Sequence, residues 1–135
     1  MKNLRAPAIA DSFSHDFTVD KSVYSAFTNT FKDQNPLHVD KNYARQKGFT
    51  DKVMHGAILV GFLSYFIGEG WPEKEVIVHF YTIQFAKPVY LNEKLKFQAN
   101  VVDYFECVNT YELKYSFTNQ DGVVVAKGKI SFGKI

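Results

Sequence analysis

Three residues suited to acid–base chemistry stand close together in FKDQNPLHVD, residues 31–40: Asp33, Asn35 and His38. A histidine titrates near neutral pH and can take a proton from water, and a neighbouring carboxylate can orient both the water and the imidazole. The amide of Asn35 offers a donor and an acceptor for holding a substrate or a water. The same residues also suit an ordinary turn, in which Asp33 ends a helix and His38 packs against the next one. Such turns are common, so this stretch by itself favours the turn.

A second polar pair, His55-Gly56, stands at the start of a long apolar segment. The first turn of a helix carries free N–H groups and a partial positive charge. Glycine lets a ligand approach such an N–H without a Cβ in the way, which is how a backbone oxyanion hole is built. The plainer alternative is a helix that tolerates a glycine near its first residue.

Ser64 places a hydroxyl in the middle of the same apolar segment. Most such serines bond the carbonyl oxygen one turn back, and contact with a polar group of an active site is the alternative. The four histidines have no metal-ligand spacing with cysteine or acidic residues, so we expect no metal site. Neither a glycine-rich phosphate loop nor a G-x-S-x-G motif is present, and Cys107 has no histidine near it in the sequence.

These residues need elements to position them, and the first half of the chain predicts helices. Polar and aromatic residues alternate over residues 11–18, which predicts a strand. Asp20 is typical of the N-cap of a helix that runs to about residue 31. Asn35-Pro36 predicts a break and a turn, because proline disfavours the helical conformation in the residue before it. A short helix is expected over Lys41–Lys47, ended by Gly48.

The apolar segment HGAILVGFLSYFIG, residues 55–68, predicts a helix that is enclosed on nearly every side. Gly61 interrupts it at a cost of roughly 1 kcal/mol against alanine, which the close approach of another backbone or a ligand would explain. Strands are expected at residues 75–85, 95–106, 111–119 and 123–132, with a hairpin turn at Asp121-Gly122. The expected fold class is therefore α+β, with an antiparallel sheet of about five strands wrapped around one central apolar helix.

The bulk composition predicts a single globular domain over residues 1–135. Hydrophobic residues make up 46% of the chain and charged residues 22%, which is ordinary for such a domain. The net charge of +2 comes without a dense basic block, so we expect no nucleic-acid partner. The longest apolar run is shorter than the ~20 residues of a membrane span, and the N-terminus lacks the apolar core of a signal peptide. A single cysteine is compatible with a reducing compartment, so we expect a cytoplasmic location.

Taken together, the two polar blocks resemble those of the MaoC-like, (R)-specific enoyl-CoA hydratases of the hot-dog fold. That family shows an acid, a variable residue, Asn-Pro, an aliphatic residue and His, followed by a His-Gly that opens the central helix. The blocks here are Asp33-Gln34-Asn35-Pro36-Leu37-His38 and, seventeen residues on, His55-Gly56. FAKPV at 85–89 and the QDG turn also look like the family's strand and turn. The resemblance spans nearly the whole chain and favours the chemical interpretation of Asp33 and His38.

The resemblance implies a hydro-lyase that reversibly hydrates a trans-2-enoyl thioester, of CoA or acyl carrier protein, to the (3R)-hydroxyacyl thioester. By analogy, Asp33 and His38 activate the water that attacks C3, and the Gly56 N–H binds the thioester oxygen as an enolate develops. Substrate-binding roles would fall to Asn35, His55 and Ser64. No cofactor is implied beyond the CoA or carrier within the substrate, because the thioester carbonyl is the electron sink.

The family also implies a homodimer, and an acyl carrier protein is a second candidate partner. Lys87, Lys94 and Lys96 could meet the phosphates of CoA or an acidic carrier, or could simply be solvated strand ends. A hot-dog acyl-thioester hydrolase and a non-catalytic acyl-thioester-binding module remain alternative functions. The acyl tail could be surrounded by aromatic residues that could equally belong to the core: Phe27, Phe31, Phe62, Phe66, Phe80 and Tyr81.

Overall fold

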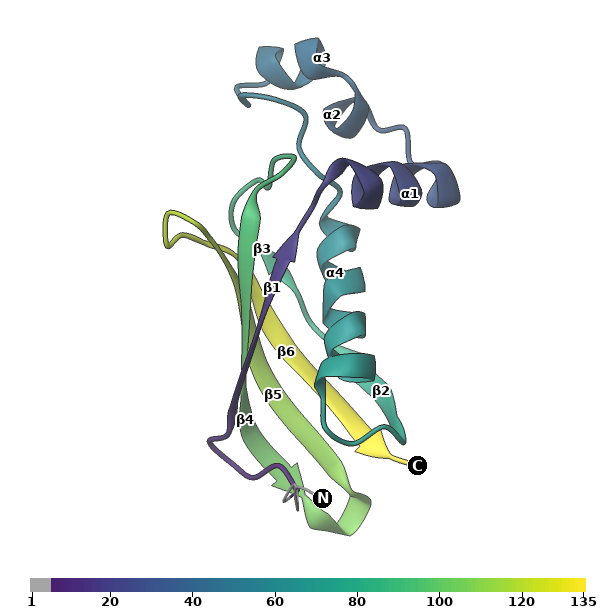
Figure 1. Cartoon of the computed structure of the whole chain (residues 1–135), viewed down its shortest axis with the longest axis vertical. Helices are drawn as coiled ribbons and strands as arrows, with labels where there is room; N and C mark the ends of the chain where they lie inside the picture. The colour runs from purple at the N-terminus through teal and green to yellow at the C-terminus, as the bar shows by residue number, and fades with distance from the viewer. Residues whose placement is uncertain (1–5) are drawn as a thin grey trace.

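A computed structural model describes residues 6–135, so the expectation about a signal peptide falls partly outside the described residues. Within them, six strands form one antiparallel sheet in the order β1-β4-β5-β6-β2, and the short β3 also pairs with β6 (Figure 1). The strands are β1 Ser12–Thr18, β2 Val76–Tyr81, β3 Gln84–Phe85, β4 Lys94–Phe105, β5 Thr110–Asn119 and β6 Val124–Lys134. The central helix α4, Gly56–Tyr65, lies along one face of this sheet. The expected α+β arrangement is therefore confirmed, with one short strand more than expected.

The prediction of one continuous strand over residues 75–85 is wrong in one respect, because the segment is divided into β2 and β3 after Tyr81. The backbone there lies against Gly128 of β6, where an added Cβ would stand 1.9 Å from the Thr82 carbonyl oxygen. That oxygen accepts a hydrogen bond from the Tyr115 hydroxyl, 2.5 Å away, and not from the neighbouring strand. The ladder between β2 and β6 also shifts register between Val78 and Phe80.

Between β1 and α4 the chain forms three helices, which lie across the N-terminal end of α4 (Figure 1). Helix α1, Lys21–Phe31, begins at Asp20, whose carboxylate accepts a hydrogen bond from the backbone N–H of Val23. Helix α3, Lys41–Gln46, is followed by Gly48 at a φ of 93°, as its glycine predicts.

Helix α2, Pro36–Val39, corrects the expectation of a simple turn at Asn35-Pro36. Proline does break the chain after α1, but it also suits the first position of a helix, where no N–H is needed. The Asn35 side-chain oxygen accepts from the N–H of Leu37 at 3.1 Å and so caps this short helix. The same two residues therefore end one element and begin the next.

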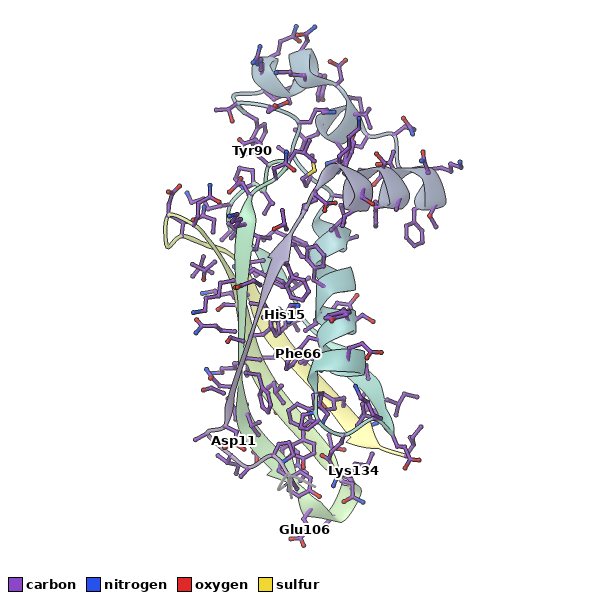
Figure 2. The ribbon with its side chains drawn as sticks, viewed as in Figure 1. Asp11, His15, Phe66, Tyr90, Glu106 and Lys134 are labelled. Carbon is purple, nitrogen blue, oxygen red and sulfur yellow. The ribbon has the colours of Figure 1, made fainter. Side chains whose placement is uncertain are left out.

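The hydrophobic core lies between α4 and the sheet. Along β4, residues Leu95, Phe97, Ala99 and Val101 are buried in alternation with exposed polar neighbours, which is the period of a half-buried strand. Phe66 projects from the end of α4 into this layer (Figure 2), where its ring lies 4.7 Å from that of Phe97. The core thus fixes α4 against the sheet.

The expectation that α4 is enclosed on all sides is wrong for this single chain. Ile58, Leu59 and Leu63 are buried against the sheet, whereas Ala57, Gly61, Ser64 and Tyr65 are exposed on the other side. The helix continues into a wider turn, η1 Phe66–Gly70. Across the described residues, none of the helices combines the length and the apolar character that crossing a membrane requires.

Candidate active site

Asp33, His38 and His55 meet at the N-terminal end of α4. Each offers a potential ligand or proton-transfer atom, and these atoms all lie within 4.8 Å of one another. They come from three elements, because Asp33 lies in the loop after α1, His38 in α2 and His55 at the N-cap of α4. The tertiary structure therefore brings the two blocks of the sequence into one cluster.

The loop that carries Asp33 is held by its own polar groups. The Asp33 carboxylate accepts from the backbone N–H of Asn35 at 3.1 Å, and the backbone N–H of His38 donates to the carbonyl oxygen of Asn35 at 2.8 Å. The side-chain oxygen of Asn35 caps α2 with one of its lone pairs, and within the described residues its NH2 group makes no hydrogen bond to the loop. Asn35 thus organises the loop at the position where a substrate contact was expected.

The orientation of His38 is set by backbone groups on two sides. Its Nδ1 lies 2.7 Å from the carbonyl oxygen of Val53, and the Tyr24 hydroxyl donates to the carbonyl oxygen of His38 at 2.7 Å. A carbonyl oxygen can only accept, so Nδ1 carries the hydrogen and the neutral ring has its lone pair on Nε2. The Val53 N–H donates to the carbonyl oxygen of Leu37 at 3.1 Å. Together with the His38–Val53 contact, this bond connects α2 to the segment before α4.

His55 lies behind this loop and is only 2% exposed. Its Nε2 donates to the backbone carbonyl oxygen of Asp33 at 3.1 Å and lies 4.0 Å from the Asp33 carboxylate. Its ring centroid is 4.1 Å from that of His38 and 4.7 Å from that of Phe27. Burial lowers the pKa of His55 below its usual 6.5 and His38 acts in the same direction, while the carbonyl and carboxylate of Asp33 oppose the change. His55 is therefore neutral at neutral pH and anchors the Asp33 loop.

Gly56 lines a cavity of about 420 Å³ together with His38 and His55. As the first residue of α4, its N–H has no acceptor within the helix. The Phe85 ring packs directly on Gly56. A Cβ at position 56 would stand only 2.7 Å from the ring's Cζ. The FAKPV segment at 85–89 forms the opposite wall, and Lys87 belongs to it. Lys94 and Lys96 line a different hollow, together with Asp16 and Thr18 of β1.

Ser64 lies outside the Asp33–His38–His55 cluster and lines a second cavity of about 740 Å³ between α1 and α4. In the part of the chain that the structure describes, its hydroxyl has no hydrogen-bond partner, so the bond to the preceding turn is not made. Ala57 lines both cavities. Of the aromatic residues considered for an acyl pocket, four line the second cavity: Phe27, Phe31, Phe62 and Tyr81. Phe66 is core, and Phe80 lines a hollow elsewhere on the sheet.

The donor atoms of Asp33, His38 and His55 are close enough to hold a metal ion, but their hydrogen bonds do not suit one. His38 Nδ1 and His55 Nε2 both face carbonyl oxygens and carry hydrogens. The remaining lone pair of His55, on Nδ1, is buried without a partner among the described residues. The expectation that the site needs no metal stays a prediction.

Two contributors to the site carry no signal in the sequence. Tyr24 holds His38 through its hydroxyl, yet in the sequence it is one more aromatic residue of an amphipathic helix. The carbonyl oxygen of Val53 selects the His38 tautomer, and a backbone group leaves no trace in the sequence. Phe85 was visible as part of FAKPV, but its contact with Gly56 depends on the sheet.

A model of the MaoC-like domain family matches residues 6–120. The mitochondrial 3-hydroxyacyl-[acyl-carrier-protein] dehydratase of Arabidopsis thaliana is 27% identical over 77% of this chain and 63% of its own length. The (R)-specific enoyl-CoA hydratase of Rhodospirillum rubrum is 31% identical over 62% of this chain and 50% of its own length. The matched regions thus span about half to three fifths of these curated relatives.

Solved structures share the fold at low sequence identity. The (R)-hydratase of A. caviae, described as involved in PHA biosynthesis, superposes over 100% of both chains with a TM-score of 0.86 at 21% identity. One chain of the ChsH1–ChsH2 complex of Mycobacterium tuberculosis superposes over 95% of this chain and 98% of its own, with a TM-score of 0.82 at 12% identity. These likenesses confirm the expected hot-dog fold.

Proposed function

The chain belongs to the MaoC-like domain family, and we propose that it is a hydro-lyase acting on acyl thioesters. The reaction is the reversible addition of water to a trans-2-enoyl thioester, of CoA or acyl carrier protein, to give the (3R)-hydroxyacyl thioester. This reaction class is supported by relatives named as a 3-hydroxyacyl-[acyl-carrier-protein] dehydratase and as an (R)-specific enoyl-CoA hydratase. The observation that carries the proposal is the meeting of Asp33, the free Nε2 of His38 and the Gly56 N–H at one end of α4.

In this proposal Asp33 and His38 act on the water. The lone pair on His38 Nε2 takes a proton from the water as its oxygen attacks C3, and the Asp33 carboxylate orients the water. The protonated His38, with Asp33 beside it, then delivers that proton to C2 as the enolate collapses to the thioester, which completes the addition and returns His38 to its neutral form. A positioned general base typically contributes ~10²–10⁴-fold to a rate. The reverse sequence of steps removes water from the (3R)-hydroxyacyl thioester.

The Gly56 N–H is the proposed oxyanion donor. Negative charge moves onto the thioester oxygen as water attacks C3, and a free N–H at the start of α4 meets it with a hydrogen bond and the positive end of the helix. One such donor typically contributes ~10²–10³-fold. Asn35 and His55 have positioning roles in this scheme, since their hydrogen bonds hold the Asp33 loop.

A homodimer belongs to the proposal. Strand β2 is an edge of the sheet, and it exposes Ile77, Val78, Phe80 and Tyr81. An apolar, unpaired edge of this kind favours pairing with a second copy of the same strand. Light scattering in solution tests this part, and a monomer at micromolar concentration would contradict it.

The carrier and the location complete the proposal. Lys87 stands at the cavity of Gly56 and would meet the phosphate of CoA or of a carrier protein's phosphopantetheine arm. The exposed and unpaired Cys107 is compatible with a reducing compartment, in keeping with a cytoplasmic location. Cell fractionation would test the location.

The deciding experiment incubates the purified protein with crotonyl-CoA and follows three outcomes. Formation of (3R)-hydroxybutyryl-CoA, identified by chiral chromatography, is expected. Release of free CoA without hydration would point to a hydrolase instead. Saturable binding without turnover would point to a binding module. Asp33→Asn and His38→Ala should bind the thioester but lose hydration.

A further inference from the structure

Four aromatic rings form a stack that leads away from the proposed base, and they come from α1, α2 and the start of α4 (Figure 1). The ring centroids lie 4.1 Å apart for His38 and His55, 4.7 Å for His55 and Phe27, and 4.9 Å for Phe27 and Phe31. The planes of successive rings are inclined by 35°, 44° and 47°. The His38 ring therefore has the His55 ring against it, and Phe27 packs on His55 in turn.

We propose that His55 is a positioning residue in the reaction, and that its ring supports His38 while His38 holds the proton taken from the water. The inference rests on the proposed hydratase function. It goes beyond the hydrogen bond by which His55 holds the Asp33 loop, because it gives the ring itself a part in the proton transfer.

The proton belongs on His38 and not on His55, because the two imidazoles have different surroundings. The Nε2 of His55 donates to the carbonyl oxygen of Asp33 at 3.1 Å, and its Nδ1 is buried without a partner among the described residues. Protonation would put a hydrogen and a charge on this Nδ1, where no acceptor meets them. His38 is only partly buried, lines the cavity and has its lone pair free on Nε2. His55 therefore stays neutral while His38 gains and loses the proton.

A neutral ring at this distance stabilises the charged form of its neighbour. The face of an aromatic ring is negative, and a cation within ~6 Å of the ring centroid is attracted to it, more strongly where water is excluded. The 4.1 Å between the His38 and His55 centroids is within this range, and His55 is buried. The stack should thus favour the imidazolium form of His38, which exists only between the attack of water on C3 and the delivery of the proton to C2.

Other charged or titratable groups also surround His38 and must be kept constant in a test. Asp33 belongs to the same cluster, and the Tyr24 hydroxyl donates to the His38 carbonyl oxygen. The Nζ of Lys52 lies 4.9 Å from the centroid of the Tyr24 ring, and Lys87 lines the cavity. Of these four groups, Asp33 alone is negative at neutral pH. A substitution at position 55 leaves all four in place, so differences between such variants report on His55.

The test separates the ring of His55 from its hydrogen bond with three variants at one position. His55→Phe keeps an aromatic ring but cannot donate to Asp33, and His55→Gln can donate but has no ring. His55→Leu has neither. The measurement is the pH profile of kcat/KM for hydration of crotonyl-CoA, whose acidic limb reports the pKa of the base in the free enzyme.

The pKa of the acidic limb should follow the ring. Because the ring stabilises protonated His38, its removal should lower this pKa, by about 0.5–1 pH unit in His55→Leu and His55→Gln relative to His55→Phe. Phe66→Leu is the matched control, because Phe66 is a buried ring packed 4.7 Å from that of Phe97 at the other end of α4. Its acidic limb should coincide with that of the wild type.

The outcomes separate this inference from the function on which it rests. A wild-type protein that does not hydrate crotonyl-CoA would refute the proposed function itself. Hydration with the same acidic limb in all three variants would refute only the role of the ring. A limb that is lower in His55→Phe and His55→Leu than in His55→Gln would assign the effect to the hydrogen bond with Asp33 and also overturn the inference. Circular dichroism confirms folding, and His55→Phe against His55→Gln decides the question if His55→Leu does not fold.

Discussion

The Nδ1 atom of His38 lies 2.7 Å from the carbonyl oxygen of Val53, and this contact determines which nitrogen can act as a base. The ring donates from Nδ1 and keeps the lone pair on Nε2, and His38 belongs to the cluster that includes Asp33. Val53 comes two residues before His55, so the same short segment orients the proposed base, His38, and leads into α4. The relative position of the proposed base and the proposed oxyanion donor is thereby set by a few backbone hydrogen bonds.

His38→Ala should lower kcat/KM for crotonyl-CoA by ~10²–10⁴-fold, because it removes the proposed base. The circular dichroism spectrum should be unchanged, since His38 is only partly buried. His15→Ala is the matched control, because His15 lies on β1 midway along the sheet (Figure 2) and is exposed. Equal activity of the two variants would rule out a general-base role for His38.

Tyr24→Phe should mainly lower kcat and leave KM nearly unchanged, because Tyr24 holds the backbone of His38 and touches no reacting atom in the proposal. Loss of this hydrogen bond should also lower the free energy of unfolding by about 1 kcal/mol, measured by urea denaturation. Tyr104→Phe removes a comparable bond to Asn109 at 2.9 Å, at the opposite end of the sheet. If both variants lose activity alike, the effect is general and not one of positioning.

Gly56→Ala should lower kcat/KM by up to ~10²-fold, because it keeps the backbone N–H but adds a Cβ that hinders the approach of the thioester oxygen to this proposed donor. The added Cβ would stand 2.7 Å from the Phe85 ring, so the ring must move within the cavity beside the proposed donor. The double variant Gly56→Ala/Phe85→Leu gives the ring's space back and should recover part of the activity. Wild-type activity of Gly56→Ala would show that the close approach that glycine allows at this N–H is not needed for the reaction.

The stability of the protein should fall in acid through His55. Burial holds the folded-state pKa of His55 below the unfolded value of 6.5, so the unfolded state binds the proton more readily. The contribution of His55 is complete above pH ~6.5 and is lost as the pH falls from there toward the lower folded-state pKa. Urea unfolding between pH 7.5 and pH 5 measures it. His55→Gln, which can still donate to Asp33 but does not titrate, should show a weaker pH dependence, and an identical dependence would contradict the assignment.

Local sequence patterns were sufficient to predict most helices and strands, because the interactions that form these elements join residues close together in the sequence. Alternation of buried and exposed residues determines the face of β4, the Asp20 carboxylate satisfies the first turn of α1, and Gly122 at a φ of 77° permits the last hairpin. Helix α2 was not predicted, because Asn35-Pro36 suits both the end of one helix and the start of another. Only the fold of the neighbouring segments decides between these two possibilities.

The sequence by itself predicted the reaction class that we propose, through the family resemblance that the order and spacing of Asp33, His38 and His55-Gly56 carry. Only the tertiary structure decided the tautomer of His38, the burial of His55 and the open space beside Gly61. Each of these features depends on whether residues distant in the sequence lie beside it in the folded chain. Spacing in the sequence records which residues are present, but not which carbonyl oxygen, ring or cavity lies across from them.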